Sequence, residues 1–385
     1  MIKYLLTHLT TSELRFLLAL FLTVFFSLTL KQRKGMIHTT CAFIILYIAF
    51  GYFQLIYFST AVILNFSLVA VFRLEEYSLT VINLAILYFF KIKGEDFDSQ
   101  IEGTCDVSGI LMLLTIKMSY LGKEFDMKKH AFSDFMGYIY FVPGLILGPV
   151  SSFKSYIESP QIQNLPCLRS FLISLVFLIV SKLGENFFPV KNLYLKNISI
   201  WKRLLNIYGY NFRQRCRFYF AWNFSNGCFL IQGFKDMLNI NFILVETATS
   251  IKDLSMGWNI YTNKWLKECY FDKLKHRNVF LASLVTFTVS AMWHGIKPGY
   301  LIMFLSFCFA IPVIKGINKI ILKHAPILYP VLSRIQMVFF VMYFSLPFFL
   351  LEVHKIIQVW SSVYFYGHIY CGVGLVLFAL HSLYK

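Results

Sequence analysis

Long apolar runs recur from one end of the chain to the other, and this feature limits the fold more than any other. Hydrophobic residues make up 58% of the 385 residues, and charged residues make up only 14%. A soluble globular protein has about 25% charged residues, so a water-soluble fold of this chain could not cover its own surface. The composition therefore predicts an all-α, polytopic integral membrane protein.

The apolar runs are candidate membrane segments. In chain order they are Leu14–Leu30, Ile37–Phe58, Leu79–Phe90, Gly109–Leu121, Tyr138–Val150, Leu168–Val180, Phe218–Phe234, Val279–Trp293, Tyr300–Ile314, Ile335–Leu351 and Cys371–Leu383. Several are shorter than the roughly 20 residues that a straight span requires. The run Tyr138–Val150 contains two prolines and two glycines, which predict a kink or a re-entrant segment. We expect about ten or eleven membrane segments, with broken helices around an internal cavity, in a single domain over residues 1–385.

The net charge and the cysteine spacing indicate which partners, metal sites and disulfides to expect. The chain carries a formal net charge of +17, and in a membrane protein such an excess is typical of cytoplasmic loops that face anionic headgroups. No soluble basic face is visible, so we expect no nucleic-acid partner, although the same charge can attract an anionic cosubstrate. The eight cysteines are far apart, with no CxxC pair and no metal-ligand spacing, so we expect neither a metal site nor a disulfide framework.

One histidine, His294, ends an apolar run and is the strongest candidate for chemistry. An ionisable group at membrane depth is costly and therefore indicates a functional site. Burial favours the neutral imidazole, which can accept a proton as a general base. Gly295, Pro298 and Gly299 follow, so we expect the helix to break there and its backbone to line a cavity. The alternative is that the ring only makes an interhelical hydrogen bond.

A second candidate precedes this run, in a stretch rich in Trp, Asn, Thr and Lys at residues 256–267. On a helix, Trp258, Thr262 and Trp265 would share one face, with Asn259 beside them. An asparagine can donate a hydrogen bond to a carbonyl that gains negative charge, or it can align a substrate. The alternative is an ordinary belt of Trp, Tyr and Lys at the membrane interface.

The motifs of several common enzyme classes are absent from the sequence. There is no GxSxG elbow, no Walker A sequence, no GxGxxG in a strand–helix context and no HExxH. Serine hydrolysis, nucleotide hydrolysis and zinc proteolysis are therefore unsupported. A histidine base paired with an asparagine suits direct acyl transfer, in which an acceptor hydroxyl loses its proton and attacks a thioester without a covalent enzyme intermediate.

Two of these stretches resemble the signature motifs of the membrane-bound O-acyltransferase (MBOAT) family. They read SAMWHGIKPGY at residues 290–300 and WNIYTNKWL at residues 258–266. Three further stretches resemble the lysophospholipid acyltransferase branch of that family: Asp106–Lys117, Gly137–Pro149 and Val245–Asp253. The resemblance covers roughly residues 100–310, and the motifs occur in the family's order.

The resemblance implies a many-helix membrane fold around a catalytic tunnel in which acyl-CoA and a lipid acceptor meet. Position by position, His294 corresponds to the family's catalytic histidine and Asn259 to its paired asparagine. The implied activity is acyl-CoA:lysophospholipid O-acyltransfer to the free glycerol hydroxyl, in phospholipid remodelling at the endoplasmic reticulum membrane. It implies no metal and no tightly bound cofactor, with acyl-CoA as cosubstrate. The oligomeric state is left open, with a homodimer among the alternatives.

Further residues are candidates for substrate binding. The residues that flank the two catalytic candidates, and so are placed to line a tunnel, are Trp258, Thr262, Ser290 and Trp293. Two lysines, Lys264 and Lys267, suit the phosphates of CoA. Helix packing is the alternative for the first group, and the ordinary excess of cytoplasmic positive charge is the alternative for the lysines.

Two other functions stay open at this point. The core motifs also admit an MBOAT that acylates a protein or a neutral lipid such as a sterol or diacylglycerol. The stretches Asp106–Lys117 and Val245–Asp253 favour the phospholipid branch over that alternative. A non-enzymatic transporter or lipid scramblase with broken helices around a polar cavity is the third function, because intramembrane polar sites also mark transporters.

Overall fold

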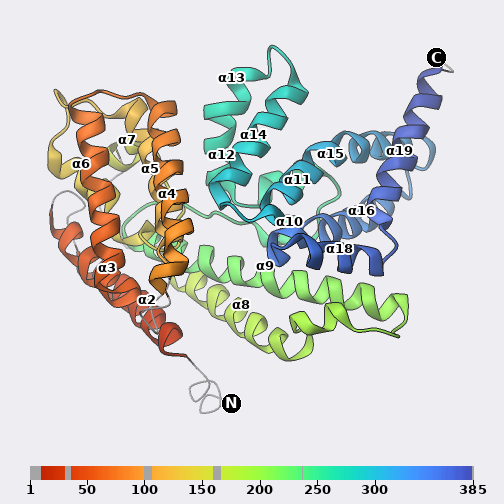
Figure 1. The fold of residues 1–385 in the computed structure, drawn as a ribbon, viewed down its shortest axis with the longest axis horizontal. Helices are drawn as coiled ribbons and strands as arrows, with labels where there is room; N and C mark the ends of the chain where they lie inside the picture. The colour runs from red at the N-terminus through yellow and green to blue at the C-terminus, as the bar shows by residue number, and fades with distance from the viewer. Residues whose placement is uncertain (1–9, 31–35, 99–105, 159–165, 236, 384–385) are drawn as a thin grey trace. The chain divides into compact units, whose positions relative to one another are not determined.

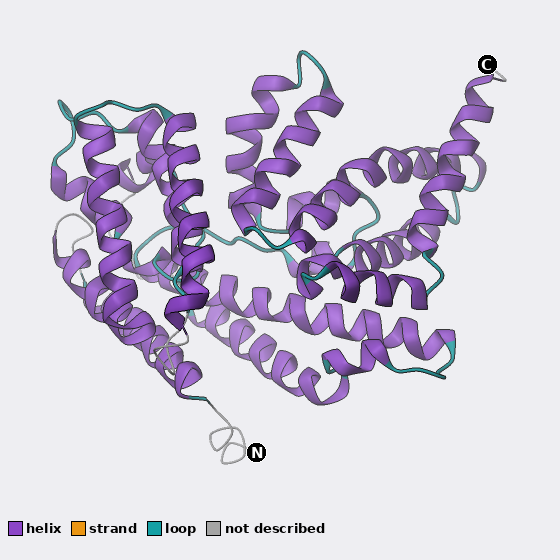
Figure 2. Ribbon diagram, in the orientation of Figure 1, coloured by secondary structure: helices purple, strands orange, loops and turns teal. Residues whose placement is uncertain are grey.

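The computed structural model describes residues 10–30, 36–98, 106–158, 166–235 and 237–383, and it leaves the side chains of 94–98 and 379–383 undescribed. Every regular element in these ranges is a helix (Figure 2). The predicted all-α fold is therefore confirmed for the described part of the chain. By its internal contacts the chain divides into two compact units, and a single domain over residues 1–385 stays a prediction.

The first unit comprises residues 1–172 and 222–238. Its helices up to residue 158 are α2 (Thr11–Thr29), α3 (Met36–Ala70), α4 (Glu76–Asp98), α5 (Ser108–Glu124), α6 (Phe132–Ile139), the 3₁₀ turn η1 (Val142–Gly144) and α7 (Phe153–Glu158) (Figure 1). Two helices contribute residues to both units: α8 (Leu168–Phe187) and α9 (Ile200–Ile231).

The second unit comprises residues 173–221 and 239–385. Its further elements are η2 (Val190–Tyr194), α10 (Phe242–Glu246), α11 (Ile251–Gly257), α12 (Ile260–Leu266), the π-helical turn η3 (Lys267–Phe271), α13 (Asp272–Leu274), α14 (Val279–His294), α15 (Pro298–His324), α16 (Tyr329–Phe344), α17 (Leu346–Leu350), α18 (Val353–Ser362) and α19 (Tyr366–Leu383). This unit contains His294 and Asn259.

Several of the described helices are suited to a bilayer. By length and composition, four spans qualify: α2, α3, α15 and the continuous stretch Tyr329–Leu350. The pair α18 and α19, bent by 73°, makes a fifth if it is one span. The other predicted runs form helices that are shorter, more polar or broken, so fewer helices qualify than the ten or eleven segments expected. The protein is nonetheless a polytopic, all-α membrane protein.

Polar contacts join neighbouring helices in the first unit. Asn65 of α3 and Asn83 of α4 exchange hydrogen bonds between their side chains, at 2.9 and 2.7 Å. Such amide pairs hold helices together where apolar burial gives little drive for association. Gly122 lets α5 approach α4 closely, because a Cβ atom there would lie 2.8 Å from the backbone nitrogen of Glu76.

The predicted break in Tyr138–Val150 is confirmed. Helix α6 ends at Ile139, and only the short turn η1 follows. The buried Lys117 of α5 donates hydrogen bonds from Nζ to the carbonyls of Tyr138 (3.2 Å) and Ile139 (2.7 Å). A cation is favourable at these carbonyls because the C-terminus of a helix carries partial negative charge. This contact explains why a lysine lies within the apolar run Gly109–Leu121.

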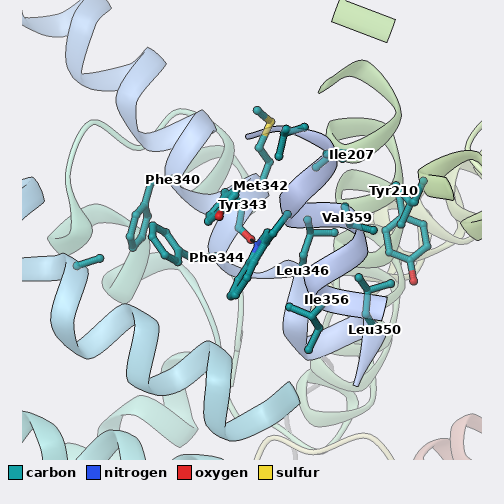
Figure 3. Packing of buried hydrophobic residues seen from close by; sticks show 14 of the residues in the cluster. Ile207, Tyr210, Phe340, Met342, Tyr343, Phe344, Leu346, Leu350, Ile356 and Val359 are labelled. Atoms are coloured by element: carbon teal, nitrogen blue, oxygen red, sulfur yellow. Dashed lines mark hydrogen bonds between the residues drawn. The ribbon is translucent and has the colours of Figure 1, made fainter. Parts of the chain in front are cut away.

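The core of the second unit is aromatic and aliphatic (Figure 3). Tyr343 of α16 stacks on Trp360 of α18 with ring centroids 5.1 Å apart, and Trp360 Nε1 donates to the Tyr343 carbonyl at 3.2 Å. Leu346 and Leu350 of α17 are buried in the same cluster. This packing anchors α17, which carries one of the rings around His294.

Candidate active site

His294 is the last residue of α14, and the backbone after it explains why the helix stops there. The helix begins at an Asn278 cap, whose Oδ1 accepts from the Leu281 N–H at 2.9 Å. Gly295 caps its C-terminus with φ 136° and ψ −166°, a conformation that glycine adopts without penalty. Pro298 then occupies the first turn of α15. The break expected from these residues is confirmed.

Four aromatic rings surround the half-buried His294 imidazole. Phe348 meets it edge to face with centroids 4.8 Å apart, and the neighbouring Trp293 is at 4.7 Å. Phe304 and Tyr300 of α15 stack on it at 5.3 and 5.5 Å. We call these rings the His294 cage. Because they come from α14, α15 and α17, tertiary packing sets the plane of the imidazole.

A glycine contact brings α17 to the cage. The Gly299 N–H donates to the Leu351 carbonyl at 2.9 Å. A Cβ atom at Gly299 would overlap the Pro347 carbonyl and lie 2.6 Å from the Leu351 Cα. Only glycine therefore permits the start of α15 to lie against α17, and this contact places Phe348 beside His294.

Asn259 begins α12 in an unusual backbone conformation. Its φ of 46° and ψ of 52° are left-handed, a region that asparagine tolerates better than other residues with a Cβ atom. Its side chain does not cap the helix. Instead, Asn259 Oδ1 accepts a hydrogen bond from Asn239 Nδ2 at 3.0 Å.

Asn239 is a site residue that does not stand out in the sequence. It is buried, and it lies in the loop before α10. Its carbonyl accepts from the Ile260 N–H at 3.0 Å, and its Oδ1 accepts from the Tyr261 N–H at 2.8 Å. The only signal for it was its place in an Asn-rich loop 20 residues before Asn259.

A path of ring contacts joins the His294 cage to the neighbourhood of Asn259. Phe348 contacts Phe218 of α9 at 6.3 Å, and Phe218 contacts Trp258 at 5.5 Å. Trp258 directly precedes Asn259 in the chain. The fold therefore brings the surroundings of the two catalytic candidates together through Phe218 and Phe348, which sequence reasoning did not identify.

An ion pair holds α9 in this arrangement. Arg215 forms two hydrogen bonds with the Glu246 carboxylate, at 2.7 and 2.8 Å, and Tyr219 donates its hydroxyl to the same group at 2.5 Å. The ring of Tyr219 also contacts Trp258, at 6.1 Å. The Glu246 carboxylate is thus held by an arginine and a tyrosine, a geometry that favours ion pairing over acid–base work at this residue.

The predicted tunnel-lining residues lie in two places. Thr262 is buried on α12, and Trp293 is buried on α14. Trp265 of α12, which is not one of the predicted tunnel-lining residues, contacts Trp293 at 6.1 Å. Ser290 is buried one turn before His294. The expected shared helical face of Trp258, Thr262 and Trp265 is wrong, because α12 begins only at Ile260 and Trp258 lies outside it. The left-handed backbone at Asn259 causes this interruption.

The two predicted CoA-binding lysines are exposed and lie beside acidic residues. Lys267 Nζ is 2.6 Å from Asp272 Oδ2, and Lys264 Nζ is 4.0 Å from Glu268 Oε1. Hydrogen bonds from Lys267 and Lys275 lower the pKa of the Asp272 carboxyl from its ordinary value. Asp272 therefore stays ionised at neutral pH and partly neutralises Lys267.

Metal ligands do not gather in the described ranges, where no three His, Cys, Asp or Glu side chains form a metal-binding group. The expectation that the reaction needs no metal stays a prediction. The groups that the described part of the chain places around His294 and Asn259 are an imidazole, two carboxamides and aromatic rings.

Comparison with known proteins identifies the family. The sequence model of the membrane-bound O-acyltransferase family matches residues 10–353. A lysophospholipid acyltransferase of Schizosaccharomyces pombe is 30% identical over 292 residues, which are 63% of this chain and 57% of the relative. A lysophospholipid acyltransferase of Saccharomyces cerevisiae is 24% identical over 74% of this chain and 59% of its own length.

A mammalian relative shows a similar relationship. Membrane-bound glycerophospholipid O-acyltransferase 1 of Mus musculus is 26% identical over 70% of this chain and 67% of the relative. The chain thus spans less than two thirds of the length of the two yeast relatives. The family match nevertheless extends over most of the described helices. The chain belongs to the membrane-bound O-acyltransferase family.

Proposed function

We propose that this membrane protein is an acyl-CoA:lysophospholipid O-acyltransferase that re-esterifies the free glycerol hydroxyl of a lysophospholipid. The names of its yeast relatives support the lysophospholipid acceptor. The observation that carries the chemistry is the position of His294, a titratable ring at the end of an apolar helix and enclosed by aromatic rings. We place the reaction at the endoplasmic reticulum membrane, where phospholipid remodelling would use it.

His294 is the general base in this proposal. Its neutral imidazole takes the proton of the glycerol hydroxyl as the oxygen attacks the thioester carbonyl. A new C–O bond forms, and the carbonyl electrons move onto the oxygen as an oxyanion. Collapse of this tetrahedral species breaks the C–S bond and releases the CoA thiolate, which receives the proton from the imidazolium. The cage rings hold the imidazole in one plane during both transfers.

Asn259 stabilises the oxyanion. Its Oδ1 is engaged by Asn239, so its Nδ2 hydrogens point away from that contact as donors. A preorganised donor of this kind contributes about 10²–10³ in rate when it faces the developing negative charge. Because Asn259 and the helix α12 are both fixed through Asn239, little reorganisation is needed when the charge appears.

The apolar rings protect the thioester from water. Trp258, Ser290 and Trp293 lie next to the catalytic candidates, and Phe218 and Phe348 join their surroundings. Together with Thr262, the flanking residues line the tunnel in which the two substrates meet. Exclusion of water matters because hydrolysis of acyl-CoA would otherwise compete with transfer.

Lys264 and Lys267 bind the phosphates of CoA in this proposal. They are exposed, and an ammonium group forms a charge-assisted hydrogen bond with phosphate. The carboxylates beside them are exchanged for phosphate when CoA binds. Lys264 on α12 and Lys267 on η3 follow Asn259 closely in the chain. CoA bound to these lysines would therefore have its phosphates near the catalytic candidates.

The test is an acyl-transfer assay with a panel of acceptors. Membranes that contain wild type, His294→Ala or His324→Ala receive mixed lysophospholipids with labelled oleoyl-CoA or arachidonoyl-CoA. His324 is the matched control because it also ends an apolar helix but is exposed. We expect labelled phospholipid from wild type and His324→Ala, and about 10²-fold less or lower from His294→Ala. Label in protein, sterol ester or triacylglycerol instead of phospholipid would contradict the proposed acceptor.

A further inference from the structure

Asn239 makes three hydrogen bonds that converge on Asn259 and on the first turn of α12. Its carbonyl and its Oδ1 accept from the N–H groups of Ile260 and Tyr261, and its Nδ2 donates to Asn259 Oδ1. Asn239 is only 2% exposed. A buried carboxamide with its oxygen and its nitrogen both engaged has a single allowed orientation.

The Tyr261 N–H determines that orientation. A backbone N–H can only donate, so the atom of Asn239 that faces it is the oxygen. The Nδ2 group of Asn239 then faces Asn259. Because Nδ2 can only donate, the atom of Asn259 that faces it is the acceptor Oδ1. Consequently the Nδ2 hydrogens of Asn259 are directed away from Asn239. One backbone N–H thus sets which end of the Asn259 amide is offered as a donor.

Asn239 also accepts the capping hydrogen bonds at the start of α12, which the Asn259 side chain would otherwise accept. An asparagine at the N-cap normally accepts from a backbone N–H of the first helical turn with its own Oδ1. Here Asn239 accepts from two of these N–H groups, and the Asn259 side chain caps neither. The left-handed backbone of Asn259 is compatible with this division of roles.

We infer that Asn239 is a positioning residue, which holds the Asn259 carboxamide with its Nδ2 donor directed at the reacting thioester carbonyl. The inference rests on the proposed function, because it requires that Asn259 acts as a donor. Asn239 itself does not touch the substrates in this account. It acts by fixing the orientation of another amide.

The decisive variant is Asn239→Asp in the full-length chain. A carboxylate still accepts from the Tyr261 N–H, so α12 stays capped, but it cannot donate to Asn259. The Asn259 amide then turns its Nδ2 group toward the carboxylate and presents its oxygen to the reacting carbonyl. We expect kcat to fall about 10²–10³-fold, as for loss of an oxyanion donor. The KM values for both substrates should stay within about threefold, because ground-state binding is unaffected.

A matched control lies two residues away. Asn241 Oδ1 accepts from the Leu244 N–H at 3.0 Å and caps α10, a role that aspartate performs equally well. We expect Asn241→Asp to keep kcat within about twofold of wild type. The two variants make the same chemical change in one loop and differ only in whether the lost NH₂ group holds Asn259.

Asn239→Ala separates positioning from folding. Without a side chain at 239, the Asn259 amide samples both orientations, so we expect a smaller loss of kcat than for Asn239→Asp, about tenfold. The melting temperature should fall more for Asn239→Ala, since it also removes the cap on α12. If Asn239 had only a structural role, Asn239→Ala would have both the lower melting temperature and the lower kcat of the two variants. That result would overturn the inference.

A double-mutant cycle completes the test. In an Asn259→Ala background, Asn239→Asp should cause no further loss of kcat, because the group that it reorients is gone. A direct repulsion between the new carboxylate and the oxyanion would persist in this background and would overturn the inference. Wild-type kcat in Asn239→Asp with a large loss in Asn259→Ala would overturn the positioning role but leave the proposed function intact. Wild-type kcat in Asn259→Ala would overturn the inference and the oxyanion role of Asn259, whereas the absence of acyl transfer in wild type would overturn the proposed function itself.

Discussion

The His294 imidazole and the Phe348 ring meet edge to face, with their centroids 4.8 Å apart. The two residues are 54 positions apart in the chain and lie on α14 and α17. Their contact depends on Gly299, because its lack of a side chain permits the approach of α15 to α17. The environment of the proposed base is therefore built by packing rather than by the signature motif around His294 alone.

Phe348→Leu should weaken catalysis without preventing folding. The shorter side chain removes the ring that meets His294 and loosens the imidazole, so we expect about tenfold lower kcat and more hydrolysis of acyl-CoA relative to transfer. Labelled phospholipid and labelled free fatty acid are measured together. Phe340→Leu is the control, because Phe340 is buried in the same unit and its ring packs on Phe307 and Phe344, outside the cage. Equal transfer-to-hydrolysis ratios in both variants would show that the cage does not exclude water.

Gly299→Ala should destabilise the second unit. The new Cβ atom overlaps the Pro347 carbonyl and the Leu351 backbone, so either α15 or α17 must move. We expect a loss of about 1–3 kcal/mol, as for other overpacked sites, with lower activity because Phe348 moves with α17. Gly372→Ala is the control, since no atom lies within 4 Å of a Cβ there. Thermal unfolding in detergent compares the two, and an unchanged melting temperature for Gly299→Ala would refute the close contact.

Much of the fold was predictable because the bilayer imposes strong rules on sequence. Apolar runs and the low charge content identify helices, and Gly295 with Pro298 marks the end of α14 beside His294. The contacts of Phe218 and Asn239 were not predictable. They depend on tertiary packing between segments that no periodicity links, and the left-handed turn at Asn259 interrupts the helix on which Trp258 was expected.

Glu246→Ala should destabilise the protein, because it leaves Arg215 buried without its carboxylate. Removing one partner of a buried ion pair costs about 3–5 kcal/mol. Replacing both partners by methionine should restore part of this loss, since no unpaired charge then remains. Glu158→Ala is the control, because Glu158 forms an exposed pair with Lys154. A full loss of kcat in Glu246→Gln at unchanged melting temperature would indicate acid–base work instead.

Asp272→Asn should tighten the binding of acyl-CoA. Lys267 and Lys275 hold the pKa of Asp272 below its ordinary value, so at neutral pH its carboxylate competes with phosphate for Lys267. Removing that charge should lower the KM for acyl-CoA severalfold, whereas Lys264→Ala combined with Lys267→Ala should raise it about tenfold, with little change in kcat. Lys129→Ala, another exposed lysine beside an aspartate, should leave KM unchanged. A KM that is insensitive both to Asp272→Asn and to the double lysine variant would exclude this lysine pair from CoA binding.

The central claim is that His294 is the general base, and single-turnover transfer tests it most directly. Wild type and His294→Ala, purified at equal abundance, are mixed with labelled acyl-CoA and saturating lysophospholipid, while binding of acyl-CoA is measured separately. We expect the single-turnover rate of His294→Ala to fall by about 10²–10⁴-fold, with acyl-CoA binding retained. A wild-type rate in His294→Ala would contradict the account.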